Sequence, residues 1–173
     1  MHRIAATSRR LLAAGALACV AAFLPAAFTT SASASAARCT TSGLVIWLDT
    51  QGNGTAGSIY YSLKLTNLSG HACTLLGYPG VSGVDLAGRR LGSAAIRNAV
   101  HAPHVVTLAN GRTASVTLRI TDVGAYSPSM CAATTAAGLR VYPPGQTASK
   151  IVPFPFQACS RSGPTYLSVE VVR

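Results

Sequence analysis

His101 and His104, in the segment "HAPH", come closest among the residues of this sequence to a metal site. Protein zinc sites combine imidazole nitrogens with cysteine sulfurs or carboxylate oxygens, and neither kind of residue stands near this pair. On an extended chain, residues three apart point to opposite faces, although Pro103 could turn the two imidazoles together. The pair is therefore half of a metal site at most, and we expect no metal ion and no other cofactor.

The sequence contains no arrangement typical of a catalytic site. A nucleophilic serine on a strained turn follows the pattern Gly-x-Ser-x-Gly, and "GVSGV" around Ser82 lacks the second glycine. A pair of carboxylates for acid–base chemistry is not expected, because the four acidic residues are spread along the chain, at Asp49, Asp85, Asp122 and Glu170. We therefore expect a protein that is not an enzyme.

Arginines are the most abundant charged residues, and they suggest a surface that binds anions. Of the 14 basic residues, three precede residue 11, which leaves 11 against four acids and a net charge of +7. The candidate anion-binding residues are Arg89, Arg90, Arg97, Arg112 and Arg119. The partners that this charge suits are an anionic cell-wall polymer, acidic lipid headgroups or another exported protein. Nucleic acid is not expected for an exported chain, and the alternative is that the charge only keeps the domain soluble.

The N-terminus has the three parts of a secretory signal. Arg3, Arg9 and Arg10 precede an apolar run over residues 11–28, and the small residues "TTSASASAA" follow. We expect residues 1–36 to be the signal, cleavage near residues 34–37, and residues 37–173 to be a single secreted or envelope-associated domain. A retained anchor, export by the twin-arginine route and lipidation at Cys19 remain alternatives.

Four cysteines follow the signal: Cys39, Cys73, Cys131 and Cys159. An even number in a small exported chain indicates disulfides, and four cysteines allow three connectivities. The sequential pairing, Cys39–Cys73 and Cys131–Cys159, closes the shortest loops, each worth about 3–4 kcal/mol in the chain-entropy model.

Apolar and polar residues alternate with a period of two along much of the chain, as in "SIYYSLKLT", "TASVTLRIT" and "TYLSVEVV". This alternation predicts strands with one face on the core and the other in water. Shorter strands are expected at 44–49, 73–77, 82–86, 89–91, 104–108 and 138–142. Asn110-Gly111 predicts a hairpin, "DLAGRRL" predicts a second one, and "CAATTAAG" is compatible with a turn or two of helix. The pattern predicts an antiparallel β-sandwich of about 7–9 strands.

The segment "YPPGQTASKIVPFPF" is an edge strand or a polyproline-like run, because Pro153 and Pro155 cannot donate hydrogen bonds to a sheet. The prolines would protect an edge against unwanted pairing. The alternative is that Phe154 and Phe156 present a binding surface.

Three stretches together resemble a known family. They are "LTNLSGHACTLLGYPGV", "LAGRRLG" and "VTLANGRTASVTL", followed by Cys131 and Cys159. From about Cys39 to the end, the chain resembles an actinobacterial secreted family called domain of unknown function 4232. The resemblance implies an immunoglobulin-like sandwich with two disulfides and implies no activity. In this setting, His71 is expected to be a solvated residue at a corner of the scaffold.

These features predict a non-enzymatic binding or interaction module. The alternative is an exported protease inhibitor that presents the loop 124–133, because Met130 lies beside a cysteine expected to be disulfide-bonded. A rigid loop lowers the entropy that binding removes, which favours tight inhibition.

Overall fold

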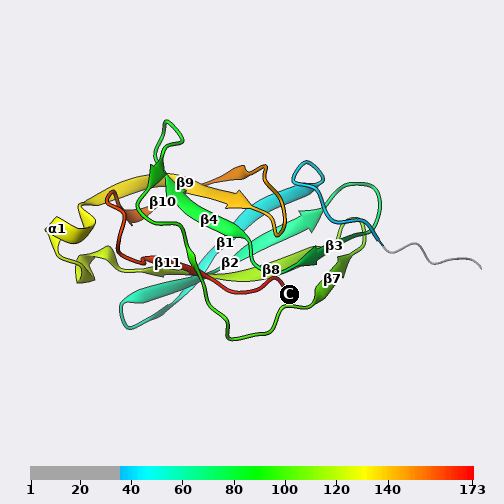
Figure 1. Cartoon of the computed structure of the whole chain (residues 1–173), viewed down its shortest axis with the longest axis horizontal. Coiled ribbons are helices and arrows are strands. Elements are labelled where there is room, and N and C mark those ends of the chain that lie inside the picture. The colour runs from blue at the N-terminus through cyan, green and yellow to red at the C-terminus, as the bar shows by residue number, and fades with distance from the viewer. Residues whose placement is uncertain (1–35) are drawn as a thin grey trace, which may run out of the picture. The chain divides into compact units, whose positions relative to one another are not determined.

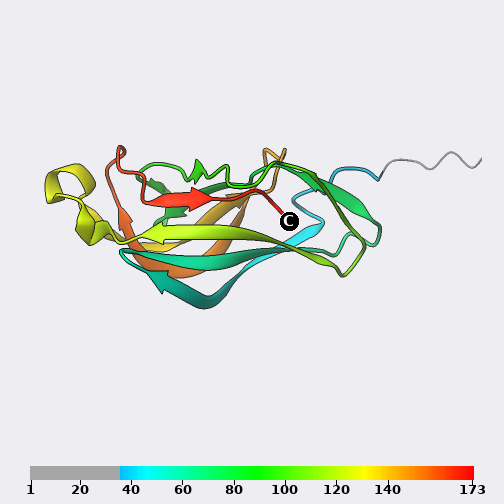
Figure 2. The ribbon, with the colours of Figure 1, turned by 90° about the horizontal axis from the view of Figure 1, so that it is seen from below.

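The chain folds into two packed layers of strands, as the computed structural model shows for residues 36–173 (Figures 1 and 2). The expected export signal and Cys19 lie outside the described residues. The elements are β1 (Leu44–Thr55), β2 (Ser58–Asn67), β3 (Cys73–Leu76), β4 (Gly80–Val84), β5 (Arg90–Leu91), β6 (Ile96–Arg97), β7 (Val105–Leu108), β8 (Thr113–Thr121), η1 (Val123–Ala125), α1 (Pro128–Cys131), β9 (Ala133–Tyr142), β10 (Lys150–Cys159) and β11 (Leu167–Val169).

The strands form two large sheets and one small one. One large sheet has the order β1-β2-β8-β11-β6, the other has the order β10-β9-β4-β5, and β3 pairs with β7. All pairs are antiparallel except β11 with β6. The predicted antiparallel β-sandwich is therefore confirmed, and two of its strands, β5 and β6, have only two residues each.

The core is built by the alternation that the sequence shows. Along β8, the buried residues Ala114, Val116, Leu118 and Ile120 alternate with partly exposed polar ones. Leu63 and Leu65 of β2 face the same core, together with residues of the opposite sheet such as Leu139 and Val141. Burial of such aliphatic side chains stabilises the fold by roughly 1.5–3 kcal/mol each.

Both disulfides have the sequential pairing. Cys39–Cys73 joins the segment before β1 to β3, and Cys131–Cys159 joins α1 to the end of β10. All four cysteines are buried, so each bridge is part of the core as well as a cross-link. In Figure 1, α1 lies at one end of the sandwich and the β3–β7 pair at the other.

The turn at Asn110-Gly111 forms, but the predicted hairpin around it is wrong. Gly111 has φ +80°, as the turn requires, yet β7 pairs with β3 while β8 pairs with β2. The turn therefore passes the chain from one sheet to another. Local turn chemistry specifies the reversal, but the partner of each strand is decided by burial in the core.

Two further expectations are corrected. The segment 131–138 is helical only at Cys131, because the chain extends from Ala133 as β9 and pairs with β10. Tyr166 and Ser168, expected to face water, are buried. Tyr166 precedes β11 and packs its ring near Phe156 of the opposite sheet, and Ser168 is paired on both sides, with Arg119 and Ile96.

The proline-rich segment is an edge strand, as predicted. β10 is the outer strand of its sheet, and Pro153 and Pro155 are exposed on it. Its register against β9 shifts between Pro153 and Phe156. The missing N–H groups and the irregularity both make this edge a poor template for pairing with another chain.

We predict that Gly138→Ala destabilises the domain by about 2–3 kcal/mol. A Cβ at Gly138 would lie 2.5 Å from the carbonyl oxygen of Val152, in the backbone of the neighbouring strand. Gly54→Ala is the matched control, because no atom lies within 4 Å of the added Cβ. Urea unfolding measures both variants, and equal stabilities would contradict the close approach of β9 and β10.

Candidate functional site

Two arginines line a pocket on the outer face of the four-stranded sheet. The pocket has a volume of about 240 Å³, and its lining includes Arg90, Arg140, Ser82 and Tyr142. The lining contains no carboxylate, histidine or cysteine. Two guanidinium groups beside hydroxyl groups are suited to hold an anion such as phosphate or carboxylate.

The register of three strands brings these residues together. Ser82 of β4 lies opposite Arg140 of β9, and Val84 of β4 lies opposite Arg90 of β5. Directly paired residues of neighbouring strands share a face of the sheet. Because Leu139 and Val141 point into the core, Arg140 and Tyr142 must point outward.

The hairpin between β4 and β5 is fixed by its own contacts. Asp85 accepts hydrogen bonds from the backbone N–H and the Nε of Arg89, both at 2.8 Å. These contacts with Arg89 lower the pKa of the Asp85 carboxyl. Arg140 also donates a hydrogen bond to the carbonyl of Gly88. Arg89 is thus occupied by its ion pair, whereas Arg90 is one of the residues that line the pocket.

Tyr166 anchors β5 from inside the sandwich. Its hydroxyl donates a hydrogen bond of 2.8 Å to the carbonyl of Leu91, the residue after Arg90. Burial raises the pKa of Tyr166 to about 12, although the Gly83 backbone and the charge of Arg90 act in the opposite direction. A neutral phenol therefore holds the strand that carries Arg90.

The other arginines expected at an anion-binding surface are placed elsewhere. Arg97 on β6 lies over the ring of Tyr78, 5.7 Å from its centroid. Arg112 is exposed in the turn before β8, and Arg119 on β8 donates hydrogen bonds to Thr121. Only Arg90 of the expected set lines the pocket, and its companion Arg140 was not in that set.

His101 is engaged with an arginine. Its Nε2 lies 3.0 Å from Nη1 of Arg173, and His104 is exposed. A guanidinium at this distance repels a metal cation and engages one of the two ring nitrogens that could bind it. Within residues 36–173, no group of three histidine, cysteine or acidic residues is placed to hold a metal ion.

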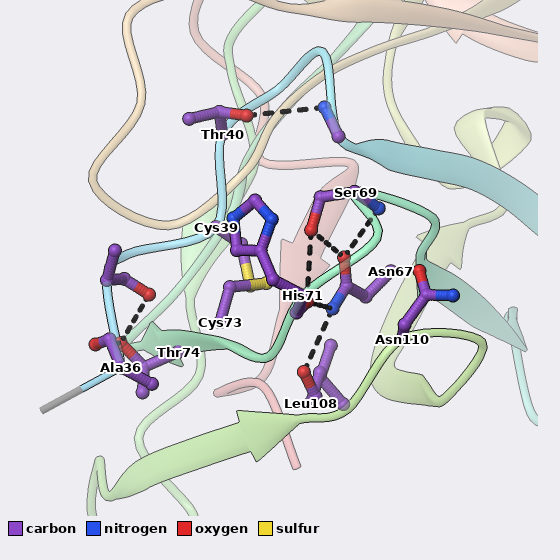
Figure 3. Close-up of a disulfide and its surroundings, with 12 residues drawn as sticks. Ala36, Cys39, Thr40, Asn67, Ser69, His71, Cys73, Thr74, Leu108 and Asn110 are labelled. Atoms are coloured by element: carbon purple, nitrogen blue, oxygen red, sulfur yellow. Dashed lines mark hydrogen bonds between the residues drawn. A yellow bond between two sulfur atoms is a disulfide. The ribbon is translucent and has the colours of Figure 1, made fainter. Parts of the chain in front are cut away.

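The corner "LTNLSGHAC" is a scaffold built on the buried amide of Asn67 (Figure 3). Its Nδ2 donates to the carbonyls of His71 and Leu108, at 2.8 and 2.9 Å. Its Oδ1 accepts from the backbone N–H and the hydroxyl of Ser69. His71 contributes its backbone carbonyl to this network and is itself exposed, so the corner has a structural role.

Phe154 and Phe156 line a groove of about 540 Å³ between β10 and the ends of β2 and β8. The two rings stack with centroids 6.0 Å apart, and Phe154 meets Tyr61 edge-on at 5.0 Å. Both phenylalanines are half-buried and pack against the core. Their first role is therefore to close this side of the sandwich.

The loop 124–133 is mostly helical. It contains the end of η1 and all of α1, with Met130 56% exposed on α1 and Cys131 buried in its disulfide.

Comparison with known proteins identifies the family. The family model described as "Domain of unknown function (DUF4232)" matches residues 39–172. The chain belongs to the DUF4232 family. The match extends over both disulfides and both large sheets, and it confirms the resemblance to domain of unknown function 4232. No curated protein and no solved structure matches this DUF4232 chain. Within residues 36–173, no helix is long and apolar enough to cross a membrane.

Sequence reasoning missed Arg140 of this DUF4232 domain, although a signal was present. Arg140 is the polar residue between two aliphatic ones in "GLRVY", which marks it as an outward residue of a strand. Arg140 and Arg90 line the same pocket only because β4 lies between β9 and β5. That strand order cannot be inferred from any local sequence pattern.

We predict that Asn67→Ala destabilises the DUF4232 domain by about 3 kcal/mol, because it removes four side-chain hydrogen bonds and leaves buried groups unpaired. Asn110→Ala is the control, since this exposed residue accepts one hydrogen bond, from the Gly70 N–H. It should lose less than about 1 kcal/mol in urea unfolding. Similar losses for the two variants would contradict a central role for Asn67.

We also predict a weaker alkaline destabilisation in Tyr166→Phe than in the parent. The folded pKa of Tyr166, about 12, lies above the unfolded value near 10. Its contribution to stability is therefore complete below pH 10 and is lost as the pH rises through 12. Between pH 8 and 11 the parent should lose on the order of 1 kcal/mol more than Tyr166→Phe. The same slope in Tyr166→Phe and in the parent would refute this assignment.

Proposed function

We propose that this DUF4232 domain is a non-enzymatic binding module that is exported to the cell envelope or the medium. In this proposal it binds an anionic cell-wall polymer through the pocket of Arg90 and Arg140. The observation that carries the proposal is that two arginines from separate strands line one pocket without a lining carboxylate.

Export is supported by the cysteines and by the N-terminal sequence. Two buried disulfides are typical of proteins from oxidising compartments outside the cytoplasm. The basic start, the apolar run and the small residues before Cys39 have the order of a cleavable signal.

The composition of the pocket supports an anionic ligand. Arginine binds phosphate and carboxylate oxygens through two parallel N–H donors. The hydroxyls of Ser82 and Tyr142 add donors to the same space. With +7 on the chain after the signal, long-range attraction would also speed encounter with a polyanion.

The same lining supports binding without catalysis. Ser82 stands in the middle of β4, and the pocket holds no imidazole or carboxylate that could activate its hydroxyl. Turnover of a bound polymer would need such a base, so retention of the ligand is the function that these residues suit.

The alternative of protease inhibition receives less support. A substrate-like inhibitor lays an extended segment along the protease cleft, where its backbone pairs as a strand. The residues around Met130 are helical instead. A helical turn closed by Cys131–Cys159 does not offer an extended segment.

We predict that the oxidised domain co-sediments with isolated cell wall, and that retention falls steeply as salt increases. Arg90→Gln combined with Arg140→Gln should weaken retention at least tenfold, because it removes the charge-assisted hydrogen bonds of the pocket. Arg97→Gln combined with Arg112→Gln is the control, because it removes the same charge from residues outside the pocket and should stay close to the parent.

Absence of retention at low salt, or equal losses for the two double variants, would contradict the proposed pocket. The same co-sedimentation is measured in parallel with vesicles of acidic lipid. Binding to vesicles but not to wall would replace the polymer by a lipid headgroup. Thermal unfolding of each variant verifies that the fold is intact.

A further inference from the structure

The outward face of the five-stranded sheet carries two aromatic residues, Trp47 and Tyr60. Trp47 on β1 lies opposite Lys64 of β2, and Tyr60 of β2 lies opposite Asn53 of β1. Trp47 is 44% exposed. A large exposed aromatic residue on a flat sheet is a feature that marks binding surfaces.

The indole of Trp47 is held in place. Its Nε1 donates a hydrogen bond of 3.2 Å to Oγ1 of Thr66, which is itself bonded to Oγ1 of Thr113 at 2.9 Å. The indole therefore lies against the neighbouring strand, with its polar atom satisfied inside the protein. The part that remains exposed is apolar and already ordered, so a ligand that stacks on it orders little more of the protein.

A polar depression of about 630 Å³ lies beside Tyr60 on this face. Tyr60 is part of its lining, together with Asp49, Gln51, Asn53, Ser62 and Arg173. The register of β1 against β2 shifts between Asp49 and Asn53, and such irregularities turn side chains toward ligands. The lining offers carboxylate, amide, hydroxyl and guanidinium groups, so it can both donate and accept hydrogen bonds.

The charges of this face leave an excess of one positive charge, because the basic residues are Lys64, Arg173 and Arg119, which lies opposite Tyr60, and the acidic ones are Asp49 and Glu170. Arg173 lies 3.5 Å from Glu170, and Lys64 donates a hydrogen bond to Ser115. Asp49 adds a negative charge to the lining itself. This small excess does not favour a polyanion, in contrast to the pocket of Arg90 and Arg140 on the other sheet.

We propose that this face, which we call the Trp47 face (Trp47, Asp49, Asn53, Tyr60 and Ser62), binds a neutral glycan. The apolar faces of sugar rings would stack on Trp47 and Tyr60, while Asp49, Asn53 and Ser62 bond to the hydroxyl groups. Trp47 lies opposite Lys64, and Lys64 is four residues from Tyr60 along β2. The two aromatic positions are therefore about 13 Å apart along the strands. This separation suits an oligosaccharide better than a single sugar.

The chemistry of the Trp47 face favours a glycan over a peptide. A peptide added to a sheet binds along an unpaired edge, whereas Tyr60 and Ser62 are on β2, which is paired on both sides by β1 and β8. A mixture of aromatic rings with short polar side chains on a sheet face matches a ligand that has both apolar ring faces and many hydroxyls. The proposal does not depend on the anion pocket.

The test uses Trp47, which is the only tryptophan of the chain. The oxidised domain is titrated with chitin oligosaccharides and with soluble β-glucan and α-glucan oligosaccharides, and its fluorescence emission is followed. Affinity electrophoresis through gels that contain the corresponding soluble polysaccharides provides a second readout. We expect a saturable shift in emission and a retarded band with at least one of these glycans.

Variants then locate the binding. Trp47→Ala and Tyr60→Ala should each weaken the retardation at least tenfold, while Trp47→Phe should keep most of it. Val45→Ala is the matched control, because Val45 is 42% exposed two residues before Trp47 on the same strand. Arg90→Gln should bind like the parent, which separates this proposal from that of the anion pocket.

The proposal is overturned if none of the glycans shifts the emission or retards the band. It is also overturned if a glycan retards Trp47→Ala as strongly as the parent, provided that thermal unfolding shows a native fold for the variant.

Discussion

Burial of every second residue of β9 is the constraint that ties the core of this domain to its candidate site. Leu139 and Val141 are fully buried, and their burial fixes which face of the strand meets the opposite sheet. A slip of one residue would bring Arg140 and Tyr142 into the core, at a large free-energy penalty. The packing that stabilises the sandwich therefore also keeps Arg140 opposite Ser82 on the outside.

The remaining parts of the pocket depend on contacts that reach across the layers. Tyr166, the residue before β11, lies inside the sandwich and bonds to Leu91, so the segment that enters one sheet positions β5 of the other. At one end of the molecule, Asn67 and Cys39–Cys73 hold the corner between β2 and β3. At the other end, Cys131–Cys159 closes α1 on β10. These contacts connect the strands that carry the outward faces at the middle and at both ends of the sandwich.

Much of the fold was predictable because the information is local. The alternation in β2 and β8 gave their inward faces, the prolines marked β10 as an edge, and the shortest-loop argument gave both disulfides. What was not predictable depends on partners distant in sequence. The turn at Asn110-Gly111 has the residues of a hairpin, yet the strands on its two sides do not pair with each other. Instead, β7 pairs with β3 and β8 pairs with β2.

In the candidate site, too, local features could be predicted and features that depend on distant residues could not. Arg90 was recognised as a basic residue near a turn, but nothing in its surroundings indicates Arg140, which lies 50 positions later in the chain. The basic composition also suggested three further arginines, Arg97, Arg112 and Arg119. The order of the strands places all three outside the pocket. For Trp47, alternation along β1 places it outward, but only the register with β2 shows that it shares a face with Tyr60.

The two outward faces differ in chemistry. The four-stranded sheet carries the two arginines of the pocket, and the five-stranded sheet carries aromatic rings among polar side chains with an excess of one positive charge. A wall polymer that contains both sugars and phosphates offers ligands to both. Because the faces belong to different sheets, each can be altered without changing the other.

The most direct test of the central claim is a nuclear magnetic resonance titration of the ¹⁵N-labelled domain with inorganic phosphate and then glycerol phosphate, followed at the arginine Nε–Hε signals. We expect saturable shifts for Arg90 and Arg140, with Arg112 and Arg97 unchanged at the same concentrations. Shifts of similar size at all arginines, or none at Arg90 and Arg140, would show that the two side chains do not form an anion-binding site.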